Sequence, residues 1–434
     1  MRSVYLLLSL AVSSVAGISA QSPCLWLNIK GASATAVGVL FPRGFDDDPD
    51  GRSGLAAVAA AARLEAGRRS GGAMLASGAK VGADYAIVFA VVGADEVQRA
   101  VAFLAAVRGD GAGLDDDSLR LGIARAALAA DDAEFLYPGD VLMSRARQRL
   151  GAGTALARPP VGRATECSAL TPAVLRQRLA ETTPLRVAAL GVVDKAWLAA
   201  VSGMKWSKAA CPARGLATCG EVGAQPQMTT DLSARSDSPY LGVAFGAPAG
   251  AQRATFALGV EVAKMRAFRG LKLRGRELFA RAPFVRWSWL QADPIILFCR
   301  RGEDHVRLLP GQRQGASISD EVAATRRELE ALLADLRGKP PTTAELEGAR
   351  AALLGQLVLP GPEEQPAWAS EPATLPGRVQ VLLLRAHHDV DVEALEGVTA
   401  AQVGASLAAT LALERASWHA VAPRPRDNLG YRRR

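Results

Sequence analysis

The chain presents the same order of elements twice, and this repetition limits its fold more than any single motif does. The apolar, β-prone runs of the first half are residues 24–30, 36–42, 85–92 and 185–193, and those of the second are 240–247, 284–290, 294–300 and 415–421. Helical patterns fill the intervals of both halves. We predict an α+β fold of two tandem homologous domains, each a mostly antiparallel sheet with helices on it, closing like a clamshell.

The boundaries follow from composition. Residues 206–237 are rich in Gly, Pro, Ser and Thr, and we assign them to a linker. This places an N-terminal domain at residues 21–205 and a C-terminal domain at residues 238–423, followed by a basic tail at 424–434.

Residues 1–20 have the features of a secretory signal peptide. Arg2 supplies a positive start, residues 4–12 an apolar run, and Ile18-Ser19-Ala20 a small-residue cleavage site before Gln21. We therefore expect export to a periplasm or to the extracellular space. No later segment is long and uncharged enough to predict a transmembrane helix.

Composition indicates a globular protein without nucleic-acid chemistry. Hydrophobic residues make up 49% of the chain and charged residues 22%, which suits buried cores. The net charge of +8 arises mostly from Arg2 and from the five arginines of the tail, so the folded body is close to neutral. We predict no nucleic-acid partner and a solvated tail.

Five cysteines are present, and in an oxidising compartment Cys211 and Cys219 are the best candidates for a disulfide. A short, turn-rich loop separates them. Their spacing is not that of a zinc knuckle, and no histidine or second cysteine pair stands nearby. The odd count leaves at least one thiol free or bonded to another molecule.

Several stretches together resemble the insulinase family of zinc metallopeptidases, which includes pitrilysin and the mitochondrial processing peptidase. Residues 38–49, followed by Gly54-Leu55-Ala56, resemble the strand, turn and helix start that open that family's first domain. The other matching stretches are Ala94-Asp95-Glu96-Val97, residues 169–193, residues 342–355 with their Thr342–Glu345 capping box, and Val398-Thr399-Ala400-Ala401. The resemblance covers about residues 24–423.

That family's chemistry depends on His-x-x-Glu-His, whose two imidazoles bind Zn²⁺ and whose glutamate acts on the metal-bound water. The positions following Gly54-Leu55-Ala56 hold Ala57, Ala60 and Ala61 instead, and all four histidines of the chain lie beyond residue 304. The helix expected to carry a third ligand, residues 119–130, contains no carboxylate. We therefore predict no zinc and no other cofactor.

Other candidate residues have structural alternatives. His387-His388-Asp389 is the densest cluster of potential ligands, yet adjacent side chains diverge, so a structural or solvated pair is favoured over a metal site. Glu65 is expected to be an exposed charge. In heterodimeric members of the family a partner subunit supplies Arg and Tyr toward the substrate, and Arg281 with Trp287 or Trp289 resembles that pair here. The alternative for these residues is aromatic core packing with Arg281 at its rim.

The resemblance implies an exported, non-catalytic homologue that binds extended peptide, pairs with an active zinc-bearing sister subunit or with a second copy, or does both. Strand addition to a sheet edge needs main-chain hydrogen bonds and no metal. Two alternatives stay open: an active metallopeptidase with an unconventional metal site, and a scaffold that binds no peptide.

Overall fold

The structure is a computed structural model that describes residues 24–29, 31–109, 114–135, 138–150, 157–159, 161–193, 201, 228–233, 240–246, 252–273, 284–286, 295–300, 318–357, 375–388 and 393–423. These residues form two compact units, each assembled from separate parts of the chain. Unit 1 draws on residues 1–131, 158–215 and 352–392, and unit 2 on residues 132–157, 216–351 and 393–434. The mixed α+β class predicted from the sequence is confirmed in both units.

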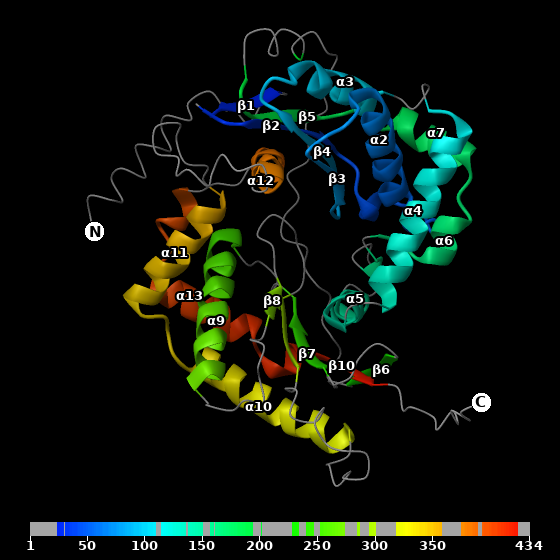
Figure 1. The fold of residues 1–434 in the computed structure, drawn as a ribbon. Coiled ribbons are helices and arrows are strands. Elements are labelled where there is room, and N and C mark those ends of the chain that lie inside the picture. The colour runs from blue at the N-terminus through cyan, green and yellow to red at the C-terminus, as the bar shows by residue number, and fades with distance from the viewer. Residues whose placement is uncertain are drawn as a thin grey trace, which may run out of the picture. The chain divides into compact units, whose positions relative to one another are not determined.

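A five-stranded sheet of order β1-β5-β2-β4-β3 organises unit 1 (Figure 1). Its strands are β1 (Cys24–Asn28), β2 (Ala34–Phe41), β3 (Ala76–Val81), β4 (Ala86–Gly93) and β5 (Arg186–Gly191). All neighbouring pairs are antiparallel except β1 and β5, which run parallel. The helices are α2 (Leu55–Gly71), α3 (Val97–Arg108), α4 (Asp116–Phe135), α6 (Ala164–Ser168), α7 (Pro172–Glu181) and α12 (Leu375–His388), with a 3₁₀ turn η1 (Phe45–Asp47).

Both faces of the central strands are covered, which explains why they read as continuous apolar runs. All eight residues of β2 are buried. On one face, Val37, Val39 and Phe41 pack in a hydrophobic cluster with α2 and α3. On the opposite face, α12 packs on β2, β4 and β5.

Unit 2 repeats the sheet order of unit 1 strand for strand, as β6-β10-β7-β9-β8. The strands are β6 (Thr229–Ser233), β7 (Tyr240–Phe245), β8 (Phe284–Arg286), β9 (Ile295–Arg300) and β10 (Ser417–Pro423). Here too the first strand in sequence, β6, runs parallel to the last, β10, and the other pairs are antiparallel. An internal duplication of one α+β unit accounts for this match.

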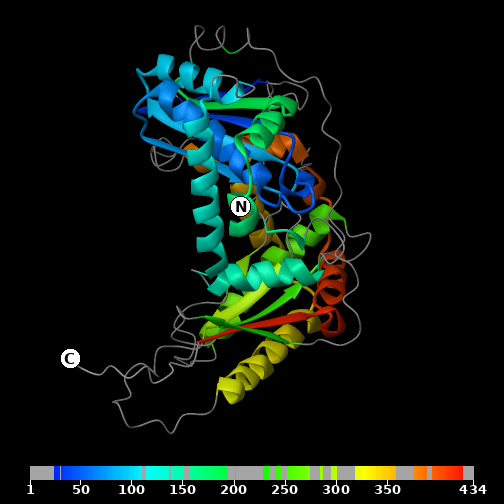
Figure 2. The ribbon, with the colours of Figure 1, turned by 90° about the vertical axis from the view of Figure 1, so that its right-hand side faces the viewer.

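The helices of unit 2 include one from the first half of the chain. They are α5 (Pro138–Leu150), α9 (Arg253–Leu273), α10 (Ile318–Gly338), α11 (Thr343–Leu357) and α13 (Ala400–Thr410), with the turns η6 (Glu393–Leu395) and η7 (Leu413–Arg415). Helix α5 packs on β10, β7 and β9, where it lies along the sheet in Figure 2. Its residues Leu142, Ala146 and Leu150 share a buried cluster with Ala244 and Val421.

The two units thus exchange a helix, a feature that the sequence analysis did not include. We placed residues 138–150 with the first domain, whereas α5 belongs to unit 2, and α12 from the second half belongs to unit 1. Strand β6 also falls within the stretch 206–237 that we assigned to a linker. Apolar patterning shows that a helix needs a covered face, but it does not say which sheet covers it.

Among the described residues, no helix is both long and apolar enough to cross a membrane.

Helix α12 depends on a glycine in the strand beneath it. A Cβ atom at Gly38 would lie 3.1 Å from Leu383 Cδ1 and 3.4 Å from Val379 Cγ2, both on α12. We expect Gly38→Val to lower the free energy of unfolding by about 2 kcal/mol because the added methyl groups overpack this interface. Chemical denaturation provides the measurement.

Gly377→Ala, on α12 itself, is the matched control. Nothing lies within 4 Å of a Cβ atom at this position. We expect this variant to be unchanged or slightly more stable, since alanine favours helix more than glycine does. Equal destabilisation by both variants would contradict the packing argument.

Candidate functional site

The candidate site is α2, the helix on which the resemblance would place a zinc motif. Of the three degenerate ligand positions, Ala60 is 2% exposed and belongs to the cluster between α2, α3 and the sheet. Ala57 and Ala61 are half-buried. The position expected to hold the catalytic glutamate therefore faces hydrocarbon.

Helix α4, where a third ligand was sought, packs directly against α2. Leu119, Ile123, Ala126 and Ala130 share a buried cluster with Leu55, Val58, Ala59 and Ala62 of α2. A Cβ atom at Gly122 would lie 3.3 Å from the Ala62 backbone, so the two helices approach closely at that point. This interface has the dense packing of a core.

Zinc does not fit this arrangement. The metal needs thiolate, imidazole or carboxylate ligands, whereas the buried α2 and α4 side chains that meet are alanine, leucine, isoleucine and valine, with Gly122 at the closest approach. Elsewhere in the described part of the chain, no group of three or more His, Cys, Asp or Glu side chains is placed to hold a metal ion.

The one carboxylate on α2 is engaged in ion pairs. Glu65 contacts the Arg125 guanidinium of α4 closely, and its second oxygen lies 3.5 Å from Arg69 Nε. Its side chain is only 12% exposed. Our expectation that Glu65 is an exposed charge was wrong, because α4 brings Arg125 against it from a position 60 residues away.

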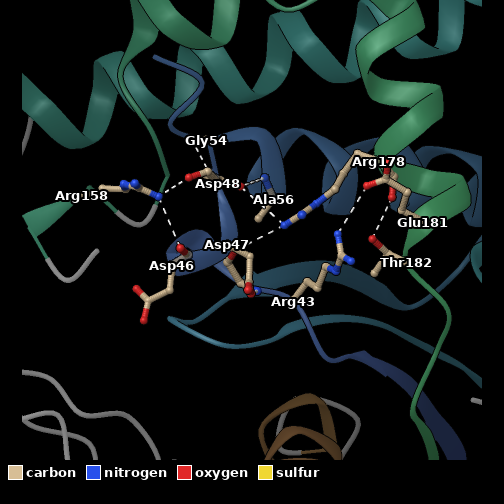
Figure 3. A network of polar contacts seen from close by, with 11 residues as sticks. Arg43, Asp46, Asp47, Asp48, Gly54, Ala56, Arg158, Arg178, Glu181 and Thr182 are labelled. Atoms are coloured by element: carbon tan, nitrogen blue, oxygen red, sulfur yellow. Dashed lines mark hydrogen bonds and ion pairs between the residues drawn. The ribbon is translucent and has the colours of Figure 1, made fainter. Parts of the chain in front are cut away.

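A buried carboxylate, Asp48, holds the start of α2 (Figure 3). Its two oxygens accept hydrogen bonds from the Gly54 amide at 2.8 Å and the Ala56 amide at 2.9 Å. The Arg178 guanidinium of α7 lies 3.6 Å from the same carboxylate. Asp48 therefore acts as an N-cap from a position six residues before Gly54, the residue that precedes the helix.

Burial raises the pKa of Asp48 to about 6, and the amides of Ala56 and Gly54 and the charge of Arg178 only partly offset it. Burial also lowers the pKa of Arg178. At neutral pH the pair is ionised, since a pKa of about 6 still lies below 7. A buried ion pair of this kind is costly to break, because removing one partner leaves the other without compensation.

Contacts around Gly54 complete the turn before α2. Gly54 has a φ of +94°, and a Cβ atom there would lie 2.5 Å from Cys167 Sγ and 2.9 Å from Gly162 Cα. The Ser53 amide donates to Glu166 at 2.8 Å. Arg158 donates to the carbonyls of Asp46 and Asp48 (Figure 3). It also pairs with Asp50 at 2.7 Å. Burial raises the pKa of Cys167 to about 11, so this thiol is protonated and packs as a core side chain.

Arg63, buried in the middle of α2, links this helix to the ends of α3 and α7 through hydrogen bonds. Its guanidinium donates to the carbonyls of Val107 and Gly109 at the end of α3, both at 2.8 Å. It also donates to Leu179 at 2.9 Å and Thr182 at 2.8 Å at the end of α7. These carbonyls lie at helix C-termini, where the helix dipole is negative, so the cation stabilises them. Nothing in the spacing of Arg63 distinguishes it from a surface arginine.

His387, on α12, is the histidine whose role the structure describes in unit 1. Its side chain is fully buried, with Nε2 3.3 Å from Asp84 Oδ2 and its ring edge-on to Tyr85. This contact agrees with the structural interpretation of that cluster. Arg281, Trp287, Cys211 and Cys219, together with the leader and the tail, lie outside the described residues, so their roles stay predictions.

Comparison with solved structures identifies the fold. An inactive domain of a peptidase M16 from Pseudomonas fluorescens matches with a TM-score of 0.64 and 16% identity, over 94% of this chain and 97% of that one. A putative M16-like peptidase from Alicyclobacillus acidocaldarius matches with a TM-score of 0.67 and 12% identity, over 92% and 96%. This chain has the M16 peptidase fold.

The M16 fold is also that of pitrilysin, which matches with a TM-score of 0.63 and 14% identity. The match covers 94% of this chain and 44% of pitrilysin, so pitrilysin is about twice as long. No family profile and no curated protein matches the chain by sequence. The insulinase and pitrilysin resemblance drawn from scattered motifs is therefore confirmed at the level of the fold.

Restoring the missing glutamate tests whether the Ala60 face of α2 is closely packed. We expect Ala60→Glu to lower the free energy of unfolding by about 3 kcal/mol, because a carboxylate would be buried in hydrocarbon without a partner. Ala61→Glu, at a half-buried position on the next residue, should cost clearly less. Equal, small effects on denaturation midpoints would show that the Ala60 face is open.

Asp48→Asn tests the anchor of α2. The asparagine side chain has one acceptor oxygen, whereas two backbone N–H groups now donate to Asp48. The substitution also removes the charge that compensates Arg178. We therefore expect the free energy of unfolding to fall by about 3 kcal/mol. Asp50→Asn makes the same chemical change in the same turn at a side chain that is 98% exposed. It should leave the denaturation midpoint nearly unchanged.

Proposed function

We propose that this chain is an exported, non-catalytic homologue of insulinase-type metallopeptidases that binds extended peptide, alone or paired with a zinc-bearing sister subunit or a second copy. The observation that carries the proposal is the hydrocarbon packing of α2. Ala60 lies in a core cluster, the buried cluster between α2 and α4 is hydrocarbon, and Glu65 at its margin is paired with Arg125, so these residues do not support hydrolysis by a bound metal at this place in the fold.

Strand β3 is the sheet edge best suited to an extended peptide. Among the described strands it pairs only with β4. Gly82, directly after β3, donates to the Tyr85 carbonyl at 2.9 Å. Because bonded and outward-facing residues alternate along a strand, the even-numbered residues face β4, and Ser77, Ala79 and Val81 direct their main-chain groups outward.

A contact on the outer side of β3 supports this alternation. Arg68, in the last turn of α2, donates through Nη2 to the Ser77 carbonyl at 3.3 Å and through Nε to Ser77 Oγ at 2.9 Å. The outward carbonyl of Ser77 is therefore bound by an exposed arginine, while Ala79 itself is exposed. Peptide addition would use the edge from Ala79 onward, or displace Arg68.

The partner hypothesis draws on solved structures that share this fold. The periplasmic protease PqqL from Escherichia coli matches 94% of this chain but 47% of its own, with a TM-score of 0.61 and 13% identity. That protein and pitrilysin are therefore each about twice as long as this chain. A chain of complex III from Candida albicans also has this fold and matches over 92% of this chain and 93% of its own, with a TM-score of 0.65 and 14% identity.

The full-length chain tests the proposal in three measurements: its zinc content, cleavage of an extended peptide with and without chelator, and binding of the uncleaved peptide. We expect no stoichiometric zinc, no chelator-sensitive cleavage, and saturable binding. Stoichiometric zinc with chelator-sensitive turnover would establish the active-peptidase alternative. If neither the chain alone nor the chain with a co-purifying subunit binds the peptide, the proposal is wrong and the alternative of a scaffold without peptide binding is supported.

Ala79→Pro tests the edge directly. Proline removes an amide donor that faces away from β4, so the ladder of unit 1 keeps its bonds, and Gly78 before it tolerates the restricted backbone. We expect peptide affinity to fall at least tenfold in a fluorescence-anisotropy titration while the circular dichroism spectrum is unchanged. Ala79→Val, which retains the amide, is the control and should bind like the unmodified chain. If the Ala79→Pro variant binds peptide as tightly as the unmodified chain, β3 is not the binding edge.

A further inference from the structure

Unit 2 contains a second buried histidine whose surroundings differ from those of His387. His419, on β10, is 1% exposed. Its Nδ1 lies 2.6 Å from Thr229 Oγ1 on β6, and its Nε2 lies 2.7 Å from Ser417 Oγ on its own strand. Hydroxyl groups can donate or accept, so these two contacts persist whether the imidazole is neutral or charged.

The charges around His419 come mostly from α5. His419 and Val421 lie on the same face of β10, since alternate residues share a face, and Val421 packs against α5. Arg145 and Arg149 of α5 both lower the pKa of His419, while Asp231 of β6 raises it. Asp231 is already bonded through both oxygens to Arg145, at 2.7 and 2.9 Å.

The other described groups on this face add no negative charge. Arg147 and Gln148 of α5 are half-buried, and Gln148 accepts from Arg145. Strand β7 contributes Gly242 opposite His419, and Tyr240 opposite Val421. A proton on His419 would therefore place a third cation beside Arg145 and Arg149, with one shared carboxylate. Burial is the largest cause of the lowered pKa of His419, which is about 4.

We propose that His419 makes the docking of α5 on the second sheet sensitive to acid. Protonation of the imidazole repels Arg145 and Arg149, and the helix that supplies Leu142, Ala146 and Leu150 to the core of unit 2 loosens from β7 and β10. Thr229, on the edge strand β6, is exposed, so its hydroxyl gives the buried ring a route to solvent protons. The proposal concerns unit 2 alone and is independent of peptide binding.

The direction of the effect follows from proton linkage. In an open form with α5 displaced, the imidazole regains its ordinary pKa of 6.5, above the folded value of about 4. The open form binds the proton more tightly, so docking is fully stable above pH 6.5 and weakens as the pH falls toward 4. The opening equilibrium constant should be about 30-fold higher at pH 5 than at pH 7.5.

Hydrogen exchange of the full-length chain, followed by mass spectrometry and corrected for intrinsic exchange rates, tests this. In the unmodified chain we expect peptides covering α5 to lose protection at pH 5 by about the 30-fold given above, while α3 of unit 1 keeps its protection. His419→Gln retains hydrogen-bonding capacity but takes up no proton, so its α5 should exchange alike at both pH values.

Arg149→Gln provides a second route if the glutamine variant folds poorly. Because one repelling charge is removed, the loss of α5 protection between pH 7.5 and pH 5 should be smaller than in the unmodified chain. Unchanged α5 protection at pH 5 would overturn the proposal. So would an equal response in His419→Gln or Arg149→Gln, or parallel loss of protection in α3, which would indicate global unfolding.

Discussion

Helix α2 must pack on a sheet on one side and on another helix on the other, and unit 1 is arranged around this requirement. Ala60 packs in the hydrophobic cluster of the sheet. Ala62 packs against α4, where a Cβ atom at Gly122 would lie 3.3 Å from Ala62 Cα. Only small side chains allow both contacts, because larger ones would separate the layers. An alanine-rich helix at this place is therefore explained by packing.

Arginines reinforce the helix ends in both units. Arg63 binds four carbonyls at the ends of α3 and α7. In unit 2, the half-buried Arg266 of α9 donates to the carbonyl of Leu336 in the last turn of α10 and to those of Lys339 and Pro340 after it, and pairs with Glu345 at 2.8 Å. That contact holds the pKa of Glu345 at about 2. A planar guanidinium with five donors suits these positions, since it can bind several carbonyls at once and still pair with a carboxylate.

Local features were predictable, and their outcomes show why. Thr171 caps α7, and Thr342 with Glu345 forms the reciprocal capping box at the start of α11, with bonds of 2.9 and 3.2 Å. Such contacts span three residues, so the sequence contains both partners. Strand β3 went unrecognised because Ala76–Val81 carries little apolar alternation and takes its place from pairing with β4. Glu65, Asp48 and His419 depend on partners up to 190 residues away, which spacing does not reveal.

The sequence alone established that the chain has no His-x-x-Glu-His, that it repeats one α+β order, and that its helices carry threonine caps, because each of these properties lies within a short stretch of chain. Only the tertiary structure decided that α4 closes against the alanines, that α5 and α12 each cover the sheet of the other half, and that His419 lies among arginines. These outcomes depend on which surfaces meet. An apolar face specifies that it must be buried, while the choice of its partner belongs to the packing of the whole chain.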